Sequence, residues 1–330
     1  MINSLWRTAT PRFASASASI GTTDADDGVV RISLHALLAL RHAAQSVPLK
    51  PGRIRAPGSG AYQSVFKGRG MEFDEVRPYT PGDDAHTLDW RVMARTGRPH
   101  TKLFREERER AVILWIDLRS SMFFATQGAF KAVRAAQAAA LLAWSAAHQG
   151  DRLGALIFSE DVHTELRPRR GKAPLLHVLR QLAEHPVWQS HIPANDSRAS
   201  AGALNQSLSR LRRVVQPGSL VILLSDFADL DDQGSAHLIQ LARHSELIVA
   251  DIHDPLEAEL PPPGIYRVSD GNSNLAMETS ERNMRERYRQ RFMQRQAEMQ
   301  QLCQRHSMVL LRISTHEEPL TALQRGLVRI

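Results

Sequence analysis

The sequence predicts an α/β protein with a doubly wound, mostly parallel sheet, preceded by a small N-terminal β-rich segment. Apolar runs without polar alternation, such as AVILWID at 111–117 and SLVILLSDF at 219–227, are typical of strands buried on both faces. Segments of helical length separate these runs, so covering helices can join parallel strands. Before residue 110, Gly, Pro and aromatic residues instead punctuate short strand-like stretches such as TKLF at 101–104.

The pattern of apolar residues predicts the position of each helix and strand. Near the N-terminus, Leu34, Leu37 and Leu38 recur at helical spacing after Ser33, which can cap the first turn. The strands expected after 111–117 are LGALIFS at 153–159, SLVILLSDF at 219–227, ELIVADI at 246–252 and SMVLLRIS at 307–314. The helices expected between and after them cover about 129–148, 174–184, 203–214, 232–244, 278–306 and 317–328.

Changes in composition divide the chain into three parts. Residues 1–28 are rich in Ser, Ala and Thr and predict a flexible tail, because they hold too little apolar surface to offset the entropy of ordering. Residues 29–110 are expected to form an N-terminal helix and a β-rich segment. Residues 111–330 hold the alternating strands and helices and predict the α/β domain.

Composition excludes several classes of function. Lys and Arg number 42 against 35 Asp and Glu, but acids and bases are interspersed, so we expect no nucleic-acid partner. A single cysteine, Cys303, excludes an internal disulfide and a multi-cysteine zinc site. No apolar segment is long enough to span a bilayer, which predicts no stable membrane insertion. These observations favour a cytoplasmic protein.

Two strands are expected to deliver acids to one edge of the sheet. Asp117 ends the first, and Ser225 and Asp226 end another. The carboxyl ends of parallel strands meet at one edge, and the hydroxyl of Ser121 follows Asp117 at a spacing that can point into the same site. Carboxylate and hydroxyl oxygens are ligands for a hard cation such as Mg²⁺ or Mn²⁺. Arg119 lies between them and cannot bind a metal.

These loops resemble a von Willebrand factor A domain with its metal-ion-dependent adhesion site. DLRSSM at 117–122, GDRLGALIFSE at 150–160 and LVILLSDF at 220–227 carry the resemblance. In that fold the first loop reads Asp-x-Ser-x-Ser, a later loop gives a Thr and a further strand end gives an Asp, so Asp117, Ser121 and Asp226 match. Arg119 replaces the first Ser, and the segment SAGALNQSL puts Gly202 at the Thr.

The arginine suggests how such a site could work without metal. If the loop closes as in that fold, the Arg119 guanidinium would lie near Asp117, and near Asp226 as well, and would neutralise them through paired hydrogen bonds. We therefore expect a degenerate adhesion site with no cofactor; Mg²⁺ or Mn²⁺ held by Asp117, Ser121 and Asp226 is the alternative. Arg119 could also bind directly the partner carboxylate that completes the metal shell in intact sites.

A longer resemblance covers the segment before the sheet. Residues 67–107, here called the signature segment, resemble a prokaryotic family numbered fifty-eight among domains of unknown function. The resemblance implies a von Willebrand-like domain after the signature and association with MoxR-type AAA+ ATPases. The specific groups of the signature have two readings of equal weight: they fix the local structure, or they form a surface that contacts a partner. These groups are Arg69, Glu72, Arg77, Tyr79, Asp83, Asp84, Asp89 and Trp90.

Two functions of different class follow. The first is a non-enzymatic interaction protein that works with a MoxR-type AAA+ ATPase in protein maturation or complex assembly. The second is a divalent-metal-dependent hydrolase that uses Asp117 and Asp226, with Asp251, His253 and Asp254 as further strand-end groups. The sequence lacks H-E-x-x-H, a phosphate-binding Gly-rich loop with Lys and Ser or Thr, and G-x-S-x-G, which argues against zinc hydrolysis, ATP binding and a serine hydrolase. The metal-dependent hydrolase needs a metal, and Arg119 stands in the metal loop, so the first function is favoured.

Overall fold

The computed structural model describes residues 28–49, 71–80, 88–106, 110–189, 197–269 and 274–328. The described residues belong to two compact units. The larger holds residues 28–49 and everything described from Arg110 onward, and the smaller holds the described residues between 71 and 106. The expected tail, residues 1–28, lies outside the described residues apart from Gly28.

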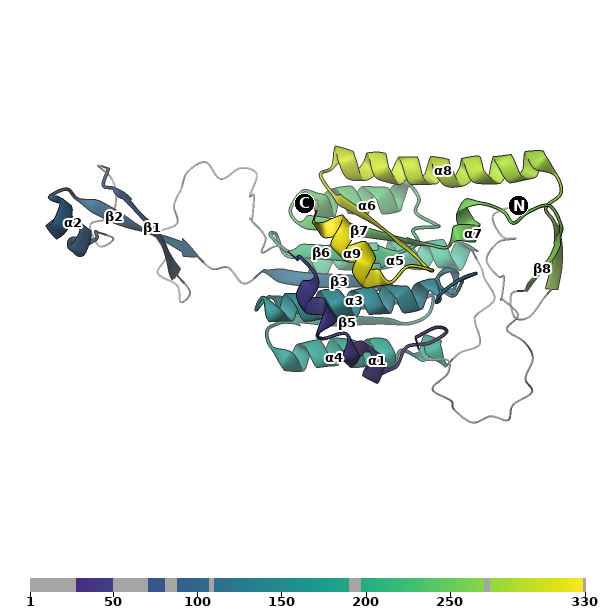
Figure 1. The fold of residues 1–330 in the computed structure, drawn as a ribbon, viewed down its shortest axis with the longest axis horizontal. Coiled ribbons are helices and arrows are strands. Elements are labelled where there is room, and N and C mark those ends of the chain that lie inside the picture. The colour runs from purple at the N-terminus through teal and green to yellow at the C-terminus, as the bar shows by residue number, and fades with distance from the viewer. Residues whose placement is uncertain are drawn as a thin grey trace. The chain divides into compact units, whose positions relative to one another are not determined.

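The larger unit is built on a six-stranded sheet (Figure 1). Its strands are β3 (Ala111–Asp117), β4 (Arg152–Phe158), β5 (His163–Arg169), β6 (Leu220–Ser225), β7 (Glu246–His253) and β10 (Val309–Ser314). They are ordered β10-β7-β6-β3-β4-β5, and within this sheet every pairing is parallel except that of β5 with β4. The chain leaves the sheet at the carboxyl ends of the parallel strands, which therefore lie along one edge.

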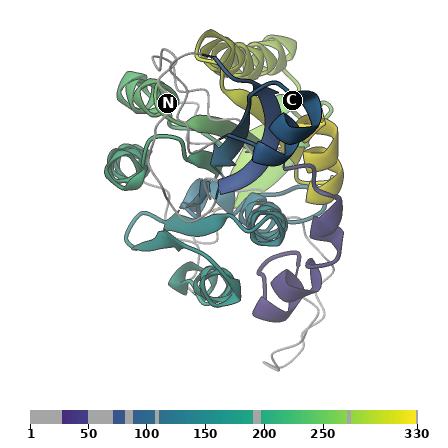
Figure 2. The same ribbon diagram turned by 90° about the vertical axis from the view of Figure 1, so that its left-hand side faces the viewer.

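Helices cover both faces of this sheet, as the end view in Figure 2 shows. They are α1 (Leu34–Ala39), α3 (Lys131–His148), α4 (Lys172–Ala183), α5 (Ser197–Val214), α6 (Asp232–Ala242), α7 (Pro255–Ala258), α8 (Arg282–Arg305) and α9 (Pro319–Leu327). Short 3₁₀ turns add Ala43–Ser46, Ser120–Met122 and Pro186–Trp188. The predicted doubly wound α/β class is confirmed. Within the described ranges, none of these helices combines the length and the apolar composition needed to cross a bilayer.

Strand β3 shows why the apolar runs do not alternate. Val112, Leu114 and Ile116 pack into a core with α1, α3, α4 and α9, whereas Ile113 and Trp115 pack into a second core with α5, α6 and α8. All five side chains are at most 2% exposed. Burial of each large apolar side chain contributes about 1.5–3 kcal/mol, so both faces of the strand select apolar residues.

The N-terminal helix belongs to the larger unit. Ser33 caps α1 as expected, because its Oγ accepts a hydrogen bond of 3.1 Å from Ala36 N. Leu37 is fully buried, and its carbonyl accepts a 3.2 Å hydrogen bond from Trp144 Nε1 on α3. The apolar stripe of α1 is therefore buried against the α/β core, which differs from the predicted grouping of residues 29–110 into one segment.

Several elements carry no apolar run and were not predicted. Strand β5 is an antiparallel edge strand whose residues are mostly half-buried or exposed, and it includes Pro168. The antiparallel hairpin of β8 (Ile265–Ser269) and β9 (Asn274–Glu278) lies before α8. The local sequence gives a weak signal in such places, because edge strands need neither alternation nor continuous burial.

The smaller unit contains a β-hairpin and one short helix. Strands β1 (Met71–Pro78) and β2 (His100–Glu106) pair antiparallel, and α2 (Trp90–Thr96) lies between them in the chain. Asp89 Oδ1 accepts hydrogen bonds from Arg91 N at 3.0 Å and Val92 N at 3.2 Å, which caps the helix. Gly97, with φ of 68°, ends it in the left-handed conformation that favours glycine.

Candidate functional site

Parallel pairing of β3 with β6 brings the two predicted acidic strand ends together. Ile116 pairs with Leu224, so the next residues, Asp117 and Ser225, meet at the edge of the sheet. Ser225 Oγ donates a 2.6 Å hydrogen bond to Asp117 Oδ2. Asp226 follows directly, and its Oδ1 accepts from Ala228 N at 3.1 Å. Asp117 and Asp226 are both at most 2% exposed.

The Arg119 side chain turns back onto Asp117. Its Nε donates to both carboxylate oxygens at 3.0 Å, and its Nη2 donates to Oδ2 at 2.7 Å. The backbone N–H of Arg119 also donates to Asp117 Oδ1 at 2.9 Å. Nη2 lies 3.7 Å from Asp226 Oδ1. The guanidinium therefore lies between the two acids, as the sequence led us to expect.

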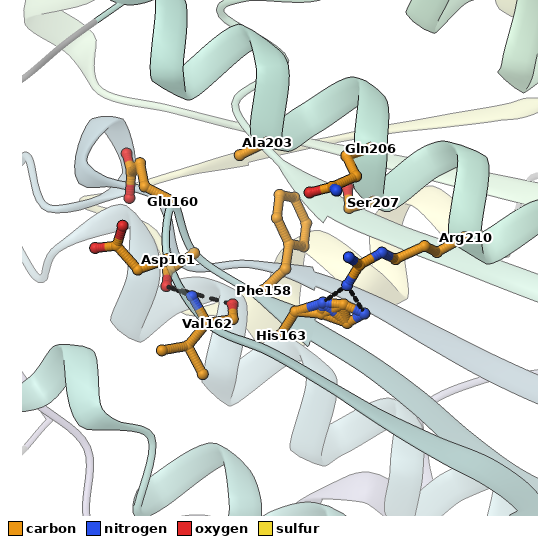
Figure 3. Close-up of a pocket in the computed structure, with 10 residues that line it drawn as sticks. Phe158, Glu160, Asp161, Val162, His163, Ala203, Gln206, Ser207 and Arg210 are labelled. Carbon is orange, nitrogen blue, oxygen red and sulfur yellow. Dashed lines mark hydrogen bonds between the residues drawn. The ribbon is translucent and has the colours of Figure 1, made fainter.

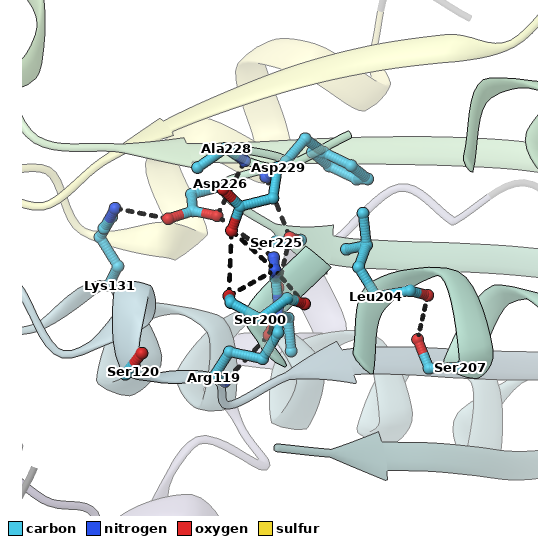
Figure 4. Close-up of polar contacts among 12 residues, drawn as sticks. Arg119, Ser120, Lys131, Ser200, Leu204, Ser207, Ser225, Asp226, Ala228 and Asp229 are labelled. Atoms are coloured by element: carbon cyan, nitrogen blue, oxygen red, sulfur yellow. Dashed lines mark hydrogen bonds and ion pairs between the residues drawn. The ribbon is translucent and has the colours of Figure 1, made fainter. Parts of the chain in front are cut away.

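The other end of the guanidinium is bound by groups that the sequence did not indicate. Nη1 donates to Ser200 O at 3.1 Å, to Ser200 Oγ at 3.0 Å and to Asp229 Oδ2 at 3.1 Å (Figure 4). Ser200 Oγ in turn donates to Asp229 Oδ2 at 2.9 Å. Arg119 is completely buried. It is therefore not placed to bind a partner's carboxylate directly, because Asp229 of this chain already takes that position.

A second buried cation, Lys131, completes the cluster. Its Nζ lies 2.8 Å from Asp226 Oδ2 and 2.6 Å from Glu257 Oε1, and the residue is 1% exposed. The sequence placed Lys131 in an expected helix, and no motif indicated that its side chain belongs to the site. A signal was present, since a lysine in the first turn of a helix is disfavoured by the helix dipole and needs a compensating acid.

The pKa shifts follow from these contacts. Burial by itself lowers the pKa of Arg119, but Asp117, Asp226 and Asp229 outweigh it and raise the pKa above its ordinary value. Burial likewise lowers the pKa of Lys131, but Asp226 and Glu257 raise it by more, so the pKa lies above its ordinary value. Both side chains therefore stay charged at neutral pH.

The donor set does not fit a divalent cation. Two permanent cations already lie within 2.8 Å of Asp117 and Asp226 oxygens. A metal ion about 4 Å from either would be repelled by roughly 4 kcal/mol per unit charge at an effective dielectric constant of 20. Ser121, the third predicted ligand, is 3% exposed, and its Oγ has no hydrogen-bond partner among the described residues. One hydroxyl does not offset that repulsion.

Gly202 does not take part in the site. It lies in α5, it is exposed, and a Cβ atom added there would meet nothing within 4 Å. The hydroxyl that α5 contributes comes instead from Ser200, two residues earlier in the same quoted segment. Ser200 is identified by its contact with Arg119 and not by the family's Thr position, which Gly202 occupies without an oxygen ligand.

The signature residues have different roles where they are described. Asp89 is structural, as the cap of α2, and Arg77 Nη1 donates to Thr80 Oγ1 at 2.6 Å beside the end of β1. Tyr79 N donates to Pro99 O at 3.0 Å. Trp90 is 64% exposed. Arg69, Asp83 and Asp84 lie outside the described residues, as does the side chain of Glu72.

The acids at the carboxyl end of β7 have structural partners. Asp254 caps α7 together with Glu257 and accepts 2.6 Å hydrogen bonds from Thr126 Oγ1 and Thr315 Oγ1. Asp251 accepts from Gln296, and burial raises its pKa. Across the described part of the chain, no group of three or more His, Cys, Asp or Glu residues is arranged to hold a metal.

Cys303 is a core residue. It is 1% exposed within the second core, and burial raises the pKa of its thiol to about 12. A thiol that stays protonated at neutral pH is a poor nucleophile.

Comparison with known proteins identifies the family. A profile described as "Protein of unknown function DUF58" matches residues 75–301. This chain belongs to the DUF58 family. The uncharacterized proteins Rv1480 of Mycobacterium tuberculosis and Mb1516 of Mycobacterium bovis are each 30% identical to this DUF58 protein over 221 residues, which are 67% of either chain. Neither the family description nor these names indicate a catalytic role.

Among solved structures, the conserved hypothetical protein BatB from Bacteroides thetaiotaomicron is similar to this DUF58 protein. The TM-score is 0.44 at 14% sequence identity, and the match covers 67% of this chain and 98% of BatB.

Proposed function

We propose that this DUF58 protein is a non-enzymatic interaction protein, an adaptor that works with a MoxR-type AAA+ ATPase in protein maturation or complex assembly. The observation that carries the proposal is the buried Arg119 guanidinium, which donates three hydrogen bonds to Asp117 within the loop that resembles an adhesion site. The site keeps the architecture of an adhesion surface and replaces the metal with a fixed side-chain cation.

Charge pairing argues for binding and against catalysis. Asp117 and Asp226 each accept from a buried cation, so neither is an available general base or metal ligand. Arg119 and Lys131 face four acids, Asp117, Asp226, Asp229 and Glu257. Asp229 and Glu257 are the partly exposed members, with side chains 14% and 19% exposed. At this edge of the sheet the buried acids are therefore paired with buried cations, and the partly exposed rim is acidic.

The partner follows from the family resemblance. In this proposal the ATPase supplies the energy and this chain supplies recognition in the cytoplasm. The acidic rim formed by Asp229 and Glu257 disfavours a nucleic-acid partner at this edge, because it would repel phosphates. The contact should be independent of divalent metal, since the cations at the site are side chains.

One observation favours the second candidate, a divalent-metal-dependent hydrolase that uses the strand-end aspartates. Ser121 Oγ is buried without a hydrogen-bond partner among the described residues, as a vacant ligand position would be. This candidate ranks below the adaptor because a metal would have to displace both Arg119 and Lys131 from the carboxylates.

A binding experiment with two purified proteins tests the proposal. The chain is immobilised and the MoxR-type ATPase of the same organism is passed over it. Binding is measured without nucleotide in EDTA and in Mg²⁺, and again in Mg²⁺ with ATP. We expect equal binding in EDTA and Mg²⁺ when nucleotide is absent. Asp229→Asn should weaken this binding, whereas Glu184→Gln, at the exposed residue directly after α4, should not. Absence of binding in every condition, or hydrolytic activity that needs metal, would overturn the proposal.

A further inference from the structure

A pocket of about 280 Å³ opens beside the Arg119 loop. The end of β4, the turn into β5 and one side of α5 line it (Figure 3). Ligand pockets for drug-sized molecules begin near 300 Å³, so this one suits a small molecule or a single side chain. Its lining includes Phe158, Glu160, Asp161, His163, Gln206 and Arg210.

Two acids mark one end of the pocket. Glu160 Oε1 is fixed by hydrogen bonds from Ser120 N at 2.8 Å and Ser120 Oγ at 2.7 Å. These bonds tie Glu160 to the loop that carries Arg119. Within the described part of the chain, Glu160 Oε2 and the exposed carboxylate of Asp161 accept no hydrogen bond. They can therefore accept from a ligand ammonium group without breaking an existing contact.

Two nitrogen-bearing side chains mark the other end. Figure 3 shows Arg210 and His163 on the opposite side of Phe158 from Glu160 and Asp161. Arg210 Nη1 donates to the His163 ring. The described residues accept no hydrogen bond from Arg210 Nε or Nη2, so these donors can bind a carboxylate in the planar geometry that arginine favours.

The base between these ends includes a fixed aromatic side chain. Phe158 is 1% exposed, and its ring lies 4.6 Å from the ring of Trp115, centroid to centroid. Gln206 and Ala203 from α5 border the same space. A short methylene chain can lie over this base while its charged ends reach the acids and the arginine.

We propose that this pocket binds a ligand with an amine at one end and a carboxylate at the other, separated by a short methylene chain. The inference goes beyond the adaptor function and does not depend on it. Two sources offer this chemistry: a free ω-amino acid, and a polypeptide ending in lysine, whose ε-amine and terminal carboxylate have the same spacing as ε-aminocaproate.

Calorimetric titration of the full-length chain tests the charge pattern of the ligand. The probes are β-alanine, γ-aminobutyrate and ε-aminocaproate, which differ in spacing, with hexanoate and hexylamine carrying one charge each. We expect one of the ω-amino acids to bind about tenfold or more tightly than either single-charge probe, because a charge-assisted hydrogen bond is lost with each missing end. Equal binding of hexanoate, or no binding by any ω-amino acid, would overturn the proposal.

Two charge-removing substitutions locate the binding. Glu160→Gln keeps an acceptor for Ser120 and removes the negative charge at one end of the pocket. Arg210→Gln removes the guanidinium at the other end. Each substitution should lower the affinity for the best probe about tenfold or more. Glu184→Gln and Arg180→Gln, an exposed pair at the C-terminal end of α4 with side chains 63% and 62% exposed, should leave that affinity unchanged. Unchanged affinity in both pocket variants, with their circular dichroism spectra native, would place the ligand elsewhere and contradict the proposal.

A peptide ending in lysine, with its C-terminal amide as control, distinguishes the two sources. Tighter binding of the free-acid peptide than of the best ω-amino acid would assign the pocket to chain termini. Binding of the ω-amino acid but not of the peptide would assign it to a free small molecule. Binding of the amidated peptide equal to that of the acid would contradict the need for a carboxylate.

Discussion

Arg119 and Asp117, two residues apart at the end of β3, are joined by three side-chain hydrogen bonds and one from the Arg119 backbone N–H. Both side chains are fully buried. The contact closes the loop on itself and places a permanent cation between the strand-end acids. The stability of the loop also depends on this one positive charge, because buried carboxylates without a cation raise the free energy of the folded state.

The first prediction concerns the loss of this cation. Arg119→Met keeps much of the side-chain volume but leaves Asp117, Asp226 and Asp229 without their guanidinium. We expect the free energy of unfolding to fall by about 3–5 kcal/mol, measured by urea denaturation at pH 7. The control is Arg325→Met, which removes an arginine paired with Glu317 but 55% exposed, and should cost about 1 kcal/mol or less. Similar losses in the two variants would contradict the role assigned to Arg119.

The second prediction concerns pH. His185 is 3% exposed, its Nδ1 accepts from Val187 N at 3.4 Å, and burial lowers its pKa from 6.5 to about 4. Because the unfolded chain takes up a proton below pH 6.5 and the folded chain does not, His185 makes stability fall as the pH drops from 6.5 to about 4. The full difference corresponds to roughly 3 kcal/mol.

His185→Asn removes the titrating ring and keeps an acceptor for the 3₁₀ turn. Urea denaturation at several pH values between 4 and 7 should show a flatter profile for this variant than for the wild type. His177→Asn, on the exposed face of α4, serves as the matched control and should follow the wild type. Parallel wild-type and His185→Asn curves would show that His185 does not carry the effect.

The third prediction compares two glycines. Gly128 has φ of +75°, and a Cβ there would lie 2.2 Å from Thr315 O, so Gly128→Ala should lower stability by roughly 2 kcal/mol or more. Gly202 is exposed on α5 with open space around it, so Gly202→Ala should raise stability by up to about 1 kcal/mol. Thermal unfolding of both variants checks the opposite signs. Destabilisation by Gly202→Ala would mean that this position is constrained after all.

The sequence predicts the sheet well because burial on both faces leaves a direct trace in β3, β6 and β7. Their continuous apolar runs match the observed strands to within one or two residues. The pairing of Asp117 with Arg119 could also be anticipated, since both residues lie in one short loop. Edge strand β5 leaves no comparable trace, because its side chains are mostly half-buried or exposed. The β8–β9 hairpin is a two-stranded sheet in which both strands are edges, and edge strands need no continuous apolar run.

The remaining members of the site depend on tertiary structure. Lys131, Ser200 and Asp229 are separated from Arg119 by 12 to 110 positions in the chain, and no local pattern links them. The packing of α3 and α5 on the sheet brings Lys131 and Ser200 to the site, and the loop after β6 brings Asp229 to the guanidinium. A motif alignment therefore finds Asp117, Ser121 and Asp226 but not the cations and acids that decide whether a metal can bind.

Calorimetric titration of the purified full-length chain with Mg²⁺ and Mn²⁺ at pH 7 tests the central claim, that Arg119 and Lys131 take the place of the metal. We predict no binding at micromolar concentration, because both carboxylates are already paired with buried cations. Micromolar binding that disappears in the isosteric Asp117→Asn variant would contradict the claim and would favour the metal-dependent hydrolase.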